Sequence, residues 1–235
     1  MKKSLLNYIL IEGTLTLRQN FGTQSKSKIV FEHTELITFA QRAFQAQRLN
    51  VEDSKLIAEH LVLADLRSQE GHGVSRIPIY LNRLKVGVVN SCPSISIDKK
   101  SEVVQIINGD NGMGFVVASL GMKQSINMAK SQGIGLVGIN NSNHFGASAG
   151  YILQALDENL ISIILTNSSP AQAPWGGSNP LLGASPIAAG APSGSHFPFL
   201  LDMALSAVSR GKLRLAHERG SNLYILYTIL GKKVK

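Results

Sequence analysis

The sequence of 235 residues is poor in cysteine and in long apolar runs. Cys92 is its one cysteine, so a disulfide within the chain is impossible. A chain without disulfides fits a reducing compartment, and we expect a cytoplasmic protein. No run of about 18 apolar residues occurs, and Asn7, Glu12 and Arg18 interrupt the apolar start of the chain. We therefore expect neither a signal peptide, a membrane-spanning helix nor a membrane partner.

Acidic residues are scarce too. The chain has 15 Asp and Glu residues against 23 Lys and Arg residues, which gives a formal net charge of +8. Such an excess can indicate a nucleic-acid-binding protein. Here it is concentrated in the basic ends of the chain, at Lys2, Lys3, Lys26, Lys28, Lys232, Lys233 and Lys235. Residues 109–192 carry few charges. This distribution predicts solvated ends, no nucleic-acid partner, and a net charge that attracts a small anionic substrate.

The chain has no internal repeat, no Walker phosphate loop and no Cys/His spacing typical of a metal site. It does contain Gly133-x-Gly135-x-x-Gly138, which matches the Rossmann dinucleotide spacing. That fingerprint must follow a strand and open a helix. Gly133 instead ends a predicted helix, and the other two glycines fall in the strand that follows. We therefore reject a Rossmann fold on this motif.

Apolar periodicity predicts a chain that begins with helices and continues as an α/β layer. Thr34 is expected to cap a first helix that reaches Phe44, and Asn50 a second helix that reaches about Arg67. The further expected helices are Ile77–Val86, Gly114–Gln132, Gly146–Asn159 and Ala204–Arg219. The expected strands are Val103–Ile107, Ile134–Ile139, Leu160–Asn167 and Phe199–Met203. Residues 170–198 are rich in Pro, Gly, Ala and Ser, which suggests backbone that passes close to a ligand.

The first candidate for chemistry is His144, in the loop Asn140–Gly146. This loop follows a predicted strand, and ligands bind at the carboxyl ends of strands in open α/β sheets. His144 is the one residue of the loop able to exchange a proton near neutral pH, which fits a general acid or base. The alternative is a surface or capping histidine in a polar loop.

The second candidate is the segment Gln69–Arg76, in which Gly71 and Gly73 flank His72. The glycines would let the backbone bend and the imidazole project, and the Arg76 guanidinium suits a substrate carboxylate. The alternative is a helix-ending turn with a solvent-facing arginine.

The third candidate is the strand-end segment Thr166–Pro170, whose small hydroxyl residues, Ser168 among them, could hydrogen-bond a phosphate or a ribose. Asp202 at the end of a later strand, followed by Met203 and Ala204, could close the same pocket. Trp175 could stack on a cofactor or serve in packing. For all of them, ordinary turn chemistry is the alternative interpretation.

Several blocks, in order along the chain, resemble the malate/L-lactate dehydrogenase family, which includes ureidoglycolate and diketogulonate dehydrogenases. The blocks are ADLRSQEGHGVSRIPIYLNRL, GDNGMGFVVASLGMKQSI, NSNHFGASAGY, NSSPAQAPWGG and LLDMALSAVSRGKLRLAHERG, between about Phe31 and Gly220. The resemblance implies a mixed-sheet, non-Rossmann cofactor domain beside a helical domain, in a homodimer. It places the helical substrate-side domain at residues 29–92 and a partial cofactor domain at 93–220, with an unassigned extension at 1–28 and a non-family tail at 221–235.

The resemblance also implies roles for the candidate residues. His144 would be the catalytic acid/base, His72 and Arg76 would bind the substrate carboxylate, and Ser168 and Asp202-Met203-Ala204 would contact NAD or NADP. The implied reaction transfers a hydride between that cofactor and a 2-hydroxy or 2-oxo acid such as malate or lactate.

The sequence departs from the family in two ways. It lacks the carboxylate that some members have at Ser169, and its resemblance stops after Gly220, so we expect an α/β fold that is incomplete at its C-terminus. The alternative to an active enzyme is an inactive remnant or a non-catalytic, partner-binding subunit.

Overall fold

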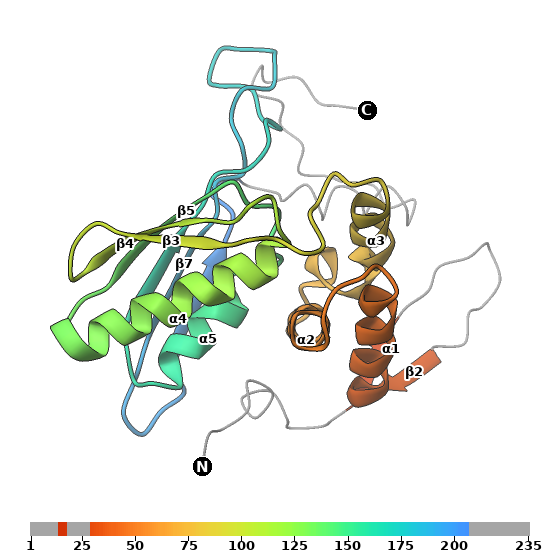
Figure 1. The fold of residues 1–235 in the computed structure, drawn as a ribbon, viewed down its shortest axis with the longest axis horizontal. Coiled ribbons are helices and arrows are strands. Elements are labelled where there is room, and N and C mark those ends of the chain that lie inside the picture. Colours follow the sequence, from red (N-terminus) through yellow and green to blue (C-terminus); the bar gives the residue numbers. More distant parts are fainter. Residues whose placement is uncertain (1–13, 18–28, 207–235) are drawn as a thin grey trace.

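The computed structural model describes residues 14–17 and 29–206 (Figure 1). Its helices are α1 His33–Gln45, α2 Val51–Leu66, α3 Ile77–Lys85, α4 Gly114–Gln132 and α5 Ala149–Leu156. Two short 3-10 turns, η2 Glu70–His72 and η3 Val74–Arg76, lie between α2 and α3. The strands are β1 Thr14–Leu17, β2 Ile29–Glu32, β3 Ser96–Lys99, β4 Val104–Asn108, β5 Leu136–Asn140, β6 Ser162–Leu165, β7 Ile187–Ala191 and β8 Phe199–Met203.

Helix α2 is the centre around which the rest of the fold packs. Its side chains Ile57, Ala58 and Leu61 are fully buried, in one apolar cluster with residues of α1, α3 and the start of α4. Leu63, on another side of α2, belongs to a second cluster that includes residues of α5. A helix that is apolar on several sides is typical of a buried core helix, and α2 therefore joins the helical part of the molecule to the part that contains the strands.

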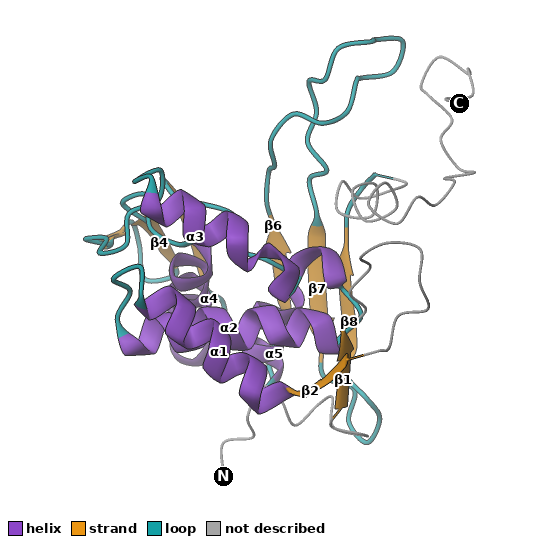
Figure 2. Cartoon of the chain, turned by 90° about the vertical axis from the view of Figure 1, so that its right-hand side faces the viewer, coloured by secondary structure: helices purple, strands orange, loops and turns teal. Residues whose placement is uncertain are grey.

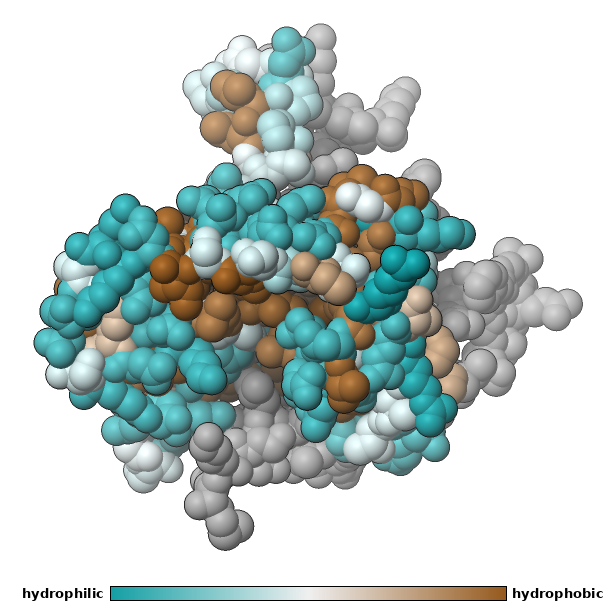
Figure 3. Space-filling model, in the orientation of Figure 1, coloured by the Kyte–Doolittle hydropathy of each residue, from teal (hydrophilic) through white to brown (hydrophobic). Residues whose placement is uncertain are grey.

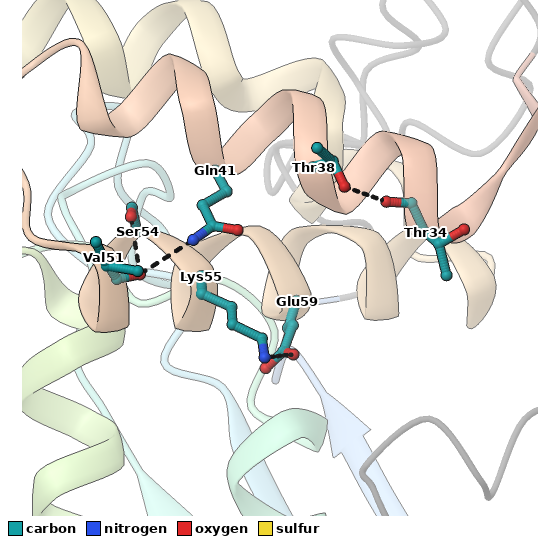
Figure 4. Close-up of polar contacts among 7 residues, drawn as sticks. All are labelled: Thr34, Thr38, Gln41, Val51, Ser54, Lys55 and Glu59. Carbon is teal, nitrogen blue, oxygen red and sulfur yellow. Dashed lines mark hydrogen bonds and ion pairs between the residues drawn. The ribbon is translucent and has the colours of Figure 1, made fainter.

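Polar contacts fix the start of α2 and its pairing with α1 (Figure 4). The Asn50 side chain accepts a hydrogen bond from Asp53 N at 2.7 Å, which confirms the predicted cap. Gln41 of α1 donates to Val51 O at 3.3 Å, and Ser54 Oγ donates to the same carbonyl at 3.0 Å. Both of these bonds go to one carbonyl, that of Val51, and the bond from Gln41 links α1 to the start of α2.

The predicted cap of α1 is wrong. The helix begins at His33, one residue before Thr34, and Glu32 at its N-cap makes no side-chain hydrogen bond to the helix. Strand β2 runs directly into α1, so the backbone enters the helix without a separate capping turn. The carbonyl of Thr34 instead accepts a hydrogen bond from Thr38 Oγ1 at 2.9 Å (Figure 4).

The first of the two larger sheets has the order β3-β4-β5 and is mixed, as expected. Strands β3 and β4 are antiparallel, whereas β4 and β5 are parallel and are connected by the crossover helix α4. Gly133 ends α4 in a left-handed conformation with φ +84°, and Gly138 lies within β5. The glycine motif therefore ends a helix and enters a strand, which confirms that it is no Rossmann fingerprint.

The second sheet has the order β6-β7-β8 and is antiparallel throughout (Figure 2). One face packs on α5, where Ile164 of β6, Ala188 of β7 and Leu200 of β8 contact buried leucines and an isoleucine of α5. The opposite face is open. Ile163 and Leu165 on it are 66% and 71% exposed. This sheet is therefore half covered by the described part of the chain.

Several element predictions need correction. Strands β3 and β7 were not predicted, and β7 lies inside the segment interpreted as ligand-contacting loop. Helix α5 begins at Ala149 rather than Gly146, because Gly146 has a φ of +76° that a right-handed helix cannot contain. The predicted helix from Ala204 is not helical over Ala204–Ser206, and its remainder lies outside the described residues.

Candidate active site

The loop after β5 brings His144 to the end of the first sheet. Asn143, the residue before it, donates to Asn111 O at 2.9 Å and to Gly112 O at 3.0 Å, and its amide oxygen accepts from Arg83 of α3 at 3.0 Å. Gly114, at the start of α4, has no room for a side chain, because a Cβ there would lie 2.1 Å from Asn143 O. The loop is therefore held from both sides, by α3 and by α4.

Three side chains from separate segments meet at His144. The ring of His72, from η2, is stacked on the His144 ring at a centroid distance of 5.8 Å and an interplanar angle of 11°. The hydroxyl oxygen of Tyr80, from α3, lies 2.7 Å from His144 Nδ1. Arg76, from η3, places its guanidinium carbon 5.7 Å from the centre of the Tyr80 ring. The structure thus brings together His72, Arg76 and His144, which the sequence offered as separate candidates.

Tyr80 is the member of this group that sequence reasoning missed. It follows Arg76 by four residues, a spacing that places two side chains on one face of a helix. It is also 4% exposed and packs edge-on against Phe115, so its pattern in the sequence is that of a core residue. The spacing from Arg76 was the one available signal, and it does not distinguish the two roles.

Two hydrogen-bonding groups lie at Nδ1 of His144. The backbone N–H of Gly146 points at this nitrogen at 3.2 Å, and the Tyr80 hydroxyl at 2.7 Å donates or accepts according to the tautomer of the ring. The pKa of His144 is lowered, first by desolvation and then by the positive charges of Arg76, His72 and Arg83. The ring is therefore neutral at pH 7. Part of the His144 residue remains exposed, which leaves it accessible to a small molecule.

Arg76 also has an unused hydrogen-bond donor. Its Nη1 donates to Gly71 O at 3.4 Å, but its Nε is buried without a hydrogen-bond partner among the described residues. Buried donors are rarely left unsatisfied in folded proteins. An anionic group that reached this point would supply the missing acceptor.

The residues proposed to contact a cofactor lie around Ala184. Ser168 Oγ accepts hydrogen bonds from Ala184 N at 2.7 Å and from Ser185 N at 3.4 Å, and Leu205 N donates to Ala184 O at 3.0 Å. Since the Ser168 hydroxyl accepts two bonds, its own hydrogen remains for donation to an acceptor. Ser168 and Leu205 therefore both bond to Ala184, although the two residues are far apart in the sequence.

Asp202 differs from the other proposed contacts because it already has protein partners. Its carboxylate accepts from Ala149 N at 2.9 Å, at the first turn of α5, and from Gln69 Nε2 at 3.3 Å. A carboxylate at a helix N-terminus is stabilising. The strand alternates, so Met203, which is 48% exposed, faces away from the helix that Asp202 caps. Trp175 is 93% exposed, in the loop between β6 and β7 that projects from the rest of the described chain (Figure 3).

The described residues contain no group of three or more His, Cys, Asp or Glu side chains that could hold a metal ion. Within the same residues, no helix is both long and apolar enough to cross a bilayer.

Comparison with known proteins shows which family has these features. The chain is 41% identical over 189 residues to the malate dehydrogenase of Pyrococcus abyssi, an alignment that covers 80% of this chain and 52% of that protein. The structure of malate dehydrogenase from Pyrococcus horikoshii OT3 superposes with a TM-score of 0.75 at 43% identity, covering 77% of this chain and 52% of that one. The chain thus spans about half the length of the relatives it matches.

More distant relatives differ in the cofactor that they are named for. One is the (2R)-3-sulfolactate dehydrogenase (NADP(+)) of Chromohalobacter salexigens, 31% identical over 79% of this chain and 56% of that protein. Another is the ureidoglycolate dehydrogenase (NAD(+)) of Escherichia coli O157:H7, 32% identical over 74% of this chain and 50% of that protein. A nicotinamide cofactor is common to both names. Residues 31–225 match the sequence profile of the malate/L-lactate dehydrogenases, and the chain belongs to this family.

Proposed function

We propose that this chain carries the acid/base and carboxylate-binding residues of an NAD(P)-dependent 2-hydroxyacid oxidoreductase. The observation that supports this most directly is the meeting of His144, Tyr80, His72 and Arg76 around one partly exposed imidazole. An acid/base group beside a guanidinium is what a 2-hydroxy acid requires, because its carboxylate and its reacting hydroxyl are on adjacent carbons.

Arg76 would bind the substrate carboxylate, with its buried Nε as one donor and His72 beside it. His144 would exchange the proton of the reacting oxygen through Nε2, the nitrogen that faces away from Tyr80 and Gly146. In the direction of reduction the imidazolium form of His144 would donate its Nε2 proton to the oxo oxygen and be left as a neutral ring. In the direction of oxidation the neutral ring would receive the hydroxyl proton on Nε2, with its own proton on Nδ1, where the Tyr80 hydroxyl oxygen can accept it. The positive charges of Arg76 and Arg83 would also favour the anionic substrate over its neutral form.

The cofactor, NAD or NADP, would supply or receive the hydride. The Ser168 hydroxyl fits an acceptor on this group, because it retains a hydrogen to donate. Met203 and Ala204 come just before Leu205, which bonds to Ala184, the residue that Ser168 also contacts. Asp202 would not contact the cofactor itself, since its carboxylate already has two protein partners. It would act indirectly, by holding β8 against α5.

A spectroscopic assay tests this proposal. The purified chain would be mixed with NADH or NADPH and a panel of 2-oxo acids at pH 7, and nicotinamide absorbance followed. We expect His144→Ala to lower kcat by about 100-fold to 10,000-fold, the usual contribution of a general acid. His196→Ala is the matched control, because His196 is exposed in the turn between β7 and β8 and should leave turnover unchanged. Equal activity of His144→Ala and the unaltered chain would contradict the assignment.

A second function is favoured by one observation, the open face of the β6-β7-β8 sheet with Ile163 and Leu165 exposed. Exposed apolar surface of this kind marks an interaction site. The chain would then be a non-catalytic, partner-binding member of the family, or an inactive remnant of it. Folded, soluble protein without turnover on any 2-oxo acid would support this alternative.

A further inference from the structure

The buried carboxylate of Asp65 contacts the backbone at the junction of the two turns, η2 and η3, that carry His72 and Arg76. Asp65 is in the last turn of α2 and is 7% exposed. The carboxyl end of a helix is an unfavourable place for a negative charge, because the free carbonyls there are the negative end of its dipole. The neighbouring Glu70 adds a second negative charge. A carboxylate in this position requires a compensating interaction.

That interaction is with the backbone of the turn. Asp65 Oδ2 accepts a hydrogen bond from Val74 N at 2.7 Å. Val74 opens η3, the 3-10 turn that ends at Arg76, and only Gly73 separates it from η2, which ends at His72. The bond therefore anchors the chain at the junction of the two turns, between the two residues that face His144.

Gly73 makes this contact possible. A Cβ on Gly73 would lie 1.9 Å from Asp65 Oδ1 and 2.2 Å from Asp65 Cγ, far inside van der Waals contact. The φ of Gly73 is −88°, which any residue can adopt, so the conformation of the backbone does not require glycine here. Glycine is needed because the Asp65 carboxyl occupies the space that a side chain would take.

We propose that Asp65 is a positioning residue, which holds the Gly71–Arg76 segment so that His72 and Arg76 are presented to His144, and that Gly73 is its required partner. The proposal rests on the proposed function, because it assigns Asp65 a role in orienting the carboxylate-binding side chains. Two further side-chain bonds lie within the two turns, since Ser75 Oγ donates to Glu70 O at 3.0 Å and Arg76 Nη1 donates to Gly71 O at 3.4 Å.

The protonation of Asp65 does not alter this role. Burial raises the pKa of Asp65 to about 7, the hydrogen bond from Val74 lowers it, and the charge of Glu70 raises it. The carboxyl thus exchanges a proton near neutral pH. Both of its forms retain an oxygen that can accept from Val74 N, and so does the amide of an asparagine.

Two substitutions at Asp65 test the proposal by turnover. Asp65→Ala removes the acceptor, and we expect KM for the 2-oxo acid to rise by about tenfold or more, the effect of one lost buried hydrogen bond. The dissociation constant of the nicotinamide cofactor should stay unchanged. Asp65→Asn should restore KM to within about threefold, because it keeps the acceptor. Ser54→Ala is the matched control, since Ser54 is also buried on α2 but bonds only within that helix.

A double-mutant cycle tests the role of Gly73. Gly73→Ala should raise KM in the unaltered chain, because the new Cβ displaces the carboxyl. In the Asp65→Ala background the same substitution should have a smaller effect, since the space is then empty. Additive effects, or an Asp65→Asn variant as impaired as Asp65→Ala, would overturn the proposal.

Hydrogen exchange separates a failure of this inference from a failure of the proposed function. The amide of Val74 should exchange faster in Asp65→Ala and Gly73→Ala than in the unaltered chain, and Asp65→Asn should retain its protection. This readout needs no turnover, so it applies even if the unaltered chain reduces no 2-oxo acid. If Asp65→Ala does not fold, Gly73→Ala provides the same comparison. Unchanged exchange at Val74 in both variants would refute the anchor.

Discussion

Helix α2 and strand β6 are built from similar apolar residues, yet they meet opposite environments. Ile57 and Leu61 of α2 are fully buried, whereas Ile163 of β6 is 66% exposed. Helix α2 contacts α1, α4 and α5, so elements of this chain enclose it on several sides. Within residues 14–17 and 29–206, strand β6 pairs with one strand, β7, and has one face covered by α5. The comparison shows that burial is decided by the available partners and not by the hydrophobicity of the residue itself.

The largest expected difference concerns the core around α2. Phe44→Ala should reduce the free energy of unfolding by about 3–5 kcal/mol, because it leaves a cavity in a closely packed cluster. Phe44 is fully buried, and Phe39 of the same helix is 64% exposed. Phe39→Ala is therefore the matched control and should change stability by less than about 0.5 kcal/mol. Urea unfolding of both variants measures the difference, and equal losses would show that the α2 region is not a packed core.

A pH effect of nearly the same size is expected from His60. This α2 residue is 5% exposed, packs against Phe115 and Tyr151, and has no hydrogen-bond partner for Nε2 among the described residues. Burial lowers the pKa of His60 to about 4. Between pH 6.5 and 4 the unfolded chain then binds the extra proton, so His60 removes up to about 3 kcal/mol of stability as the pH falls.

Asp65 changes the stability with pH in the opposite direction to His60, over an overlapping pH range. Its pKa, raised to about 7, means that the folded chain binds the proton first, so its contribution to stability increases as the pH falls from 7. The two slopes offset each other in the unaltered chain. His60→Leu should therefore give a protein whose stability rises between pH 7 and pH 4.5 relative to the unaltered chain. Parallel stability curves for the two proteins, measured by urea unfolding, would contradict this account.

The smallest expected effect is on the open face of β6. Ile163→Ser should change the free energy of unfolding by no more than about 0.5 kcal/mol, because the side chain is already largely exposed. Ile164→Ser is the matched control on the same strand and should cost about 2 kcal/mol, since Ile164 packs against α5. In analytical ultracentrifugation, copies of the Ile163→Ser variant should self-associate less than copies of the unaltered chain. A large loss of stability would mean that this face is covered.

Elements with local signals were predictable from the sequence. Asn50 with Asp53 three residues later, and Gly133 after a periodic apolar run, marked helix ends that the structure confirms. Strand β7 gave no such signal, because Ile-Ala-Ala-Gly-Ala has few residues with strand propensity. Its small residues reflect contact with α5, since a Cβ on Gly190 would lie 2.3 Å from Ile152. Tertiary packing, rather than local preference, made that strand.

The site was predictable in part. The resemblance to a family brought His72, Arg76 and His144 together, whereas the residues alone offered three separate candidates. Tyr80 could not be separated from a core residue, because its partner His144 is 64 positions away in the sequence. The role of Asp202 as a helix cap also depends on a distant partner, Ala149 N. Contacts between remote segments leave no spacing that a sequence pattern can detect.

Asp202 has one further consequence. Its carboxylate contacts Gln69, beside the turn that carries His72, and Ala149, at the start of α5, while its own strand leads to Met203 and Ala204. One side chain thus joins the two segments proposed to bind different ligands. Occupancy of either segment that displaced Asp202 would change affinity at the other, and thermodynamic reciprocity requires the two changes to be equal factors. A measurement of cofactor affinity with and without a 2-oxo acid would then give the coupling free energy between the two ligands that passes through Asp202.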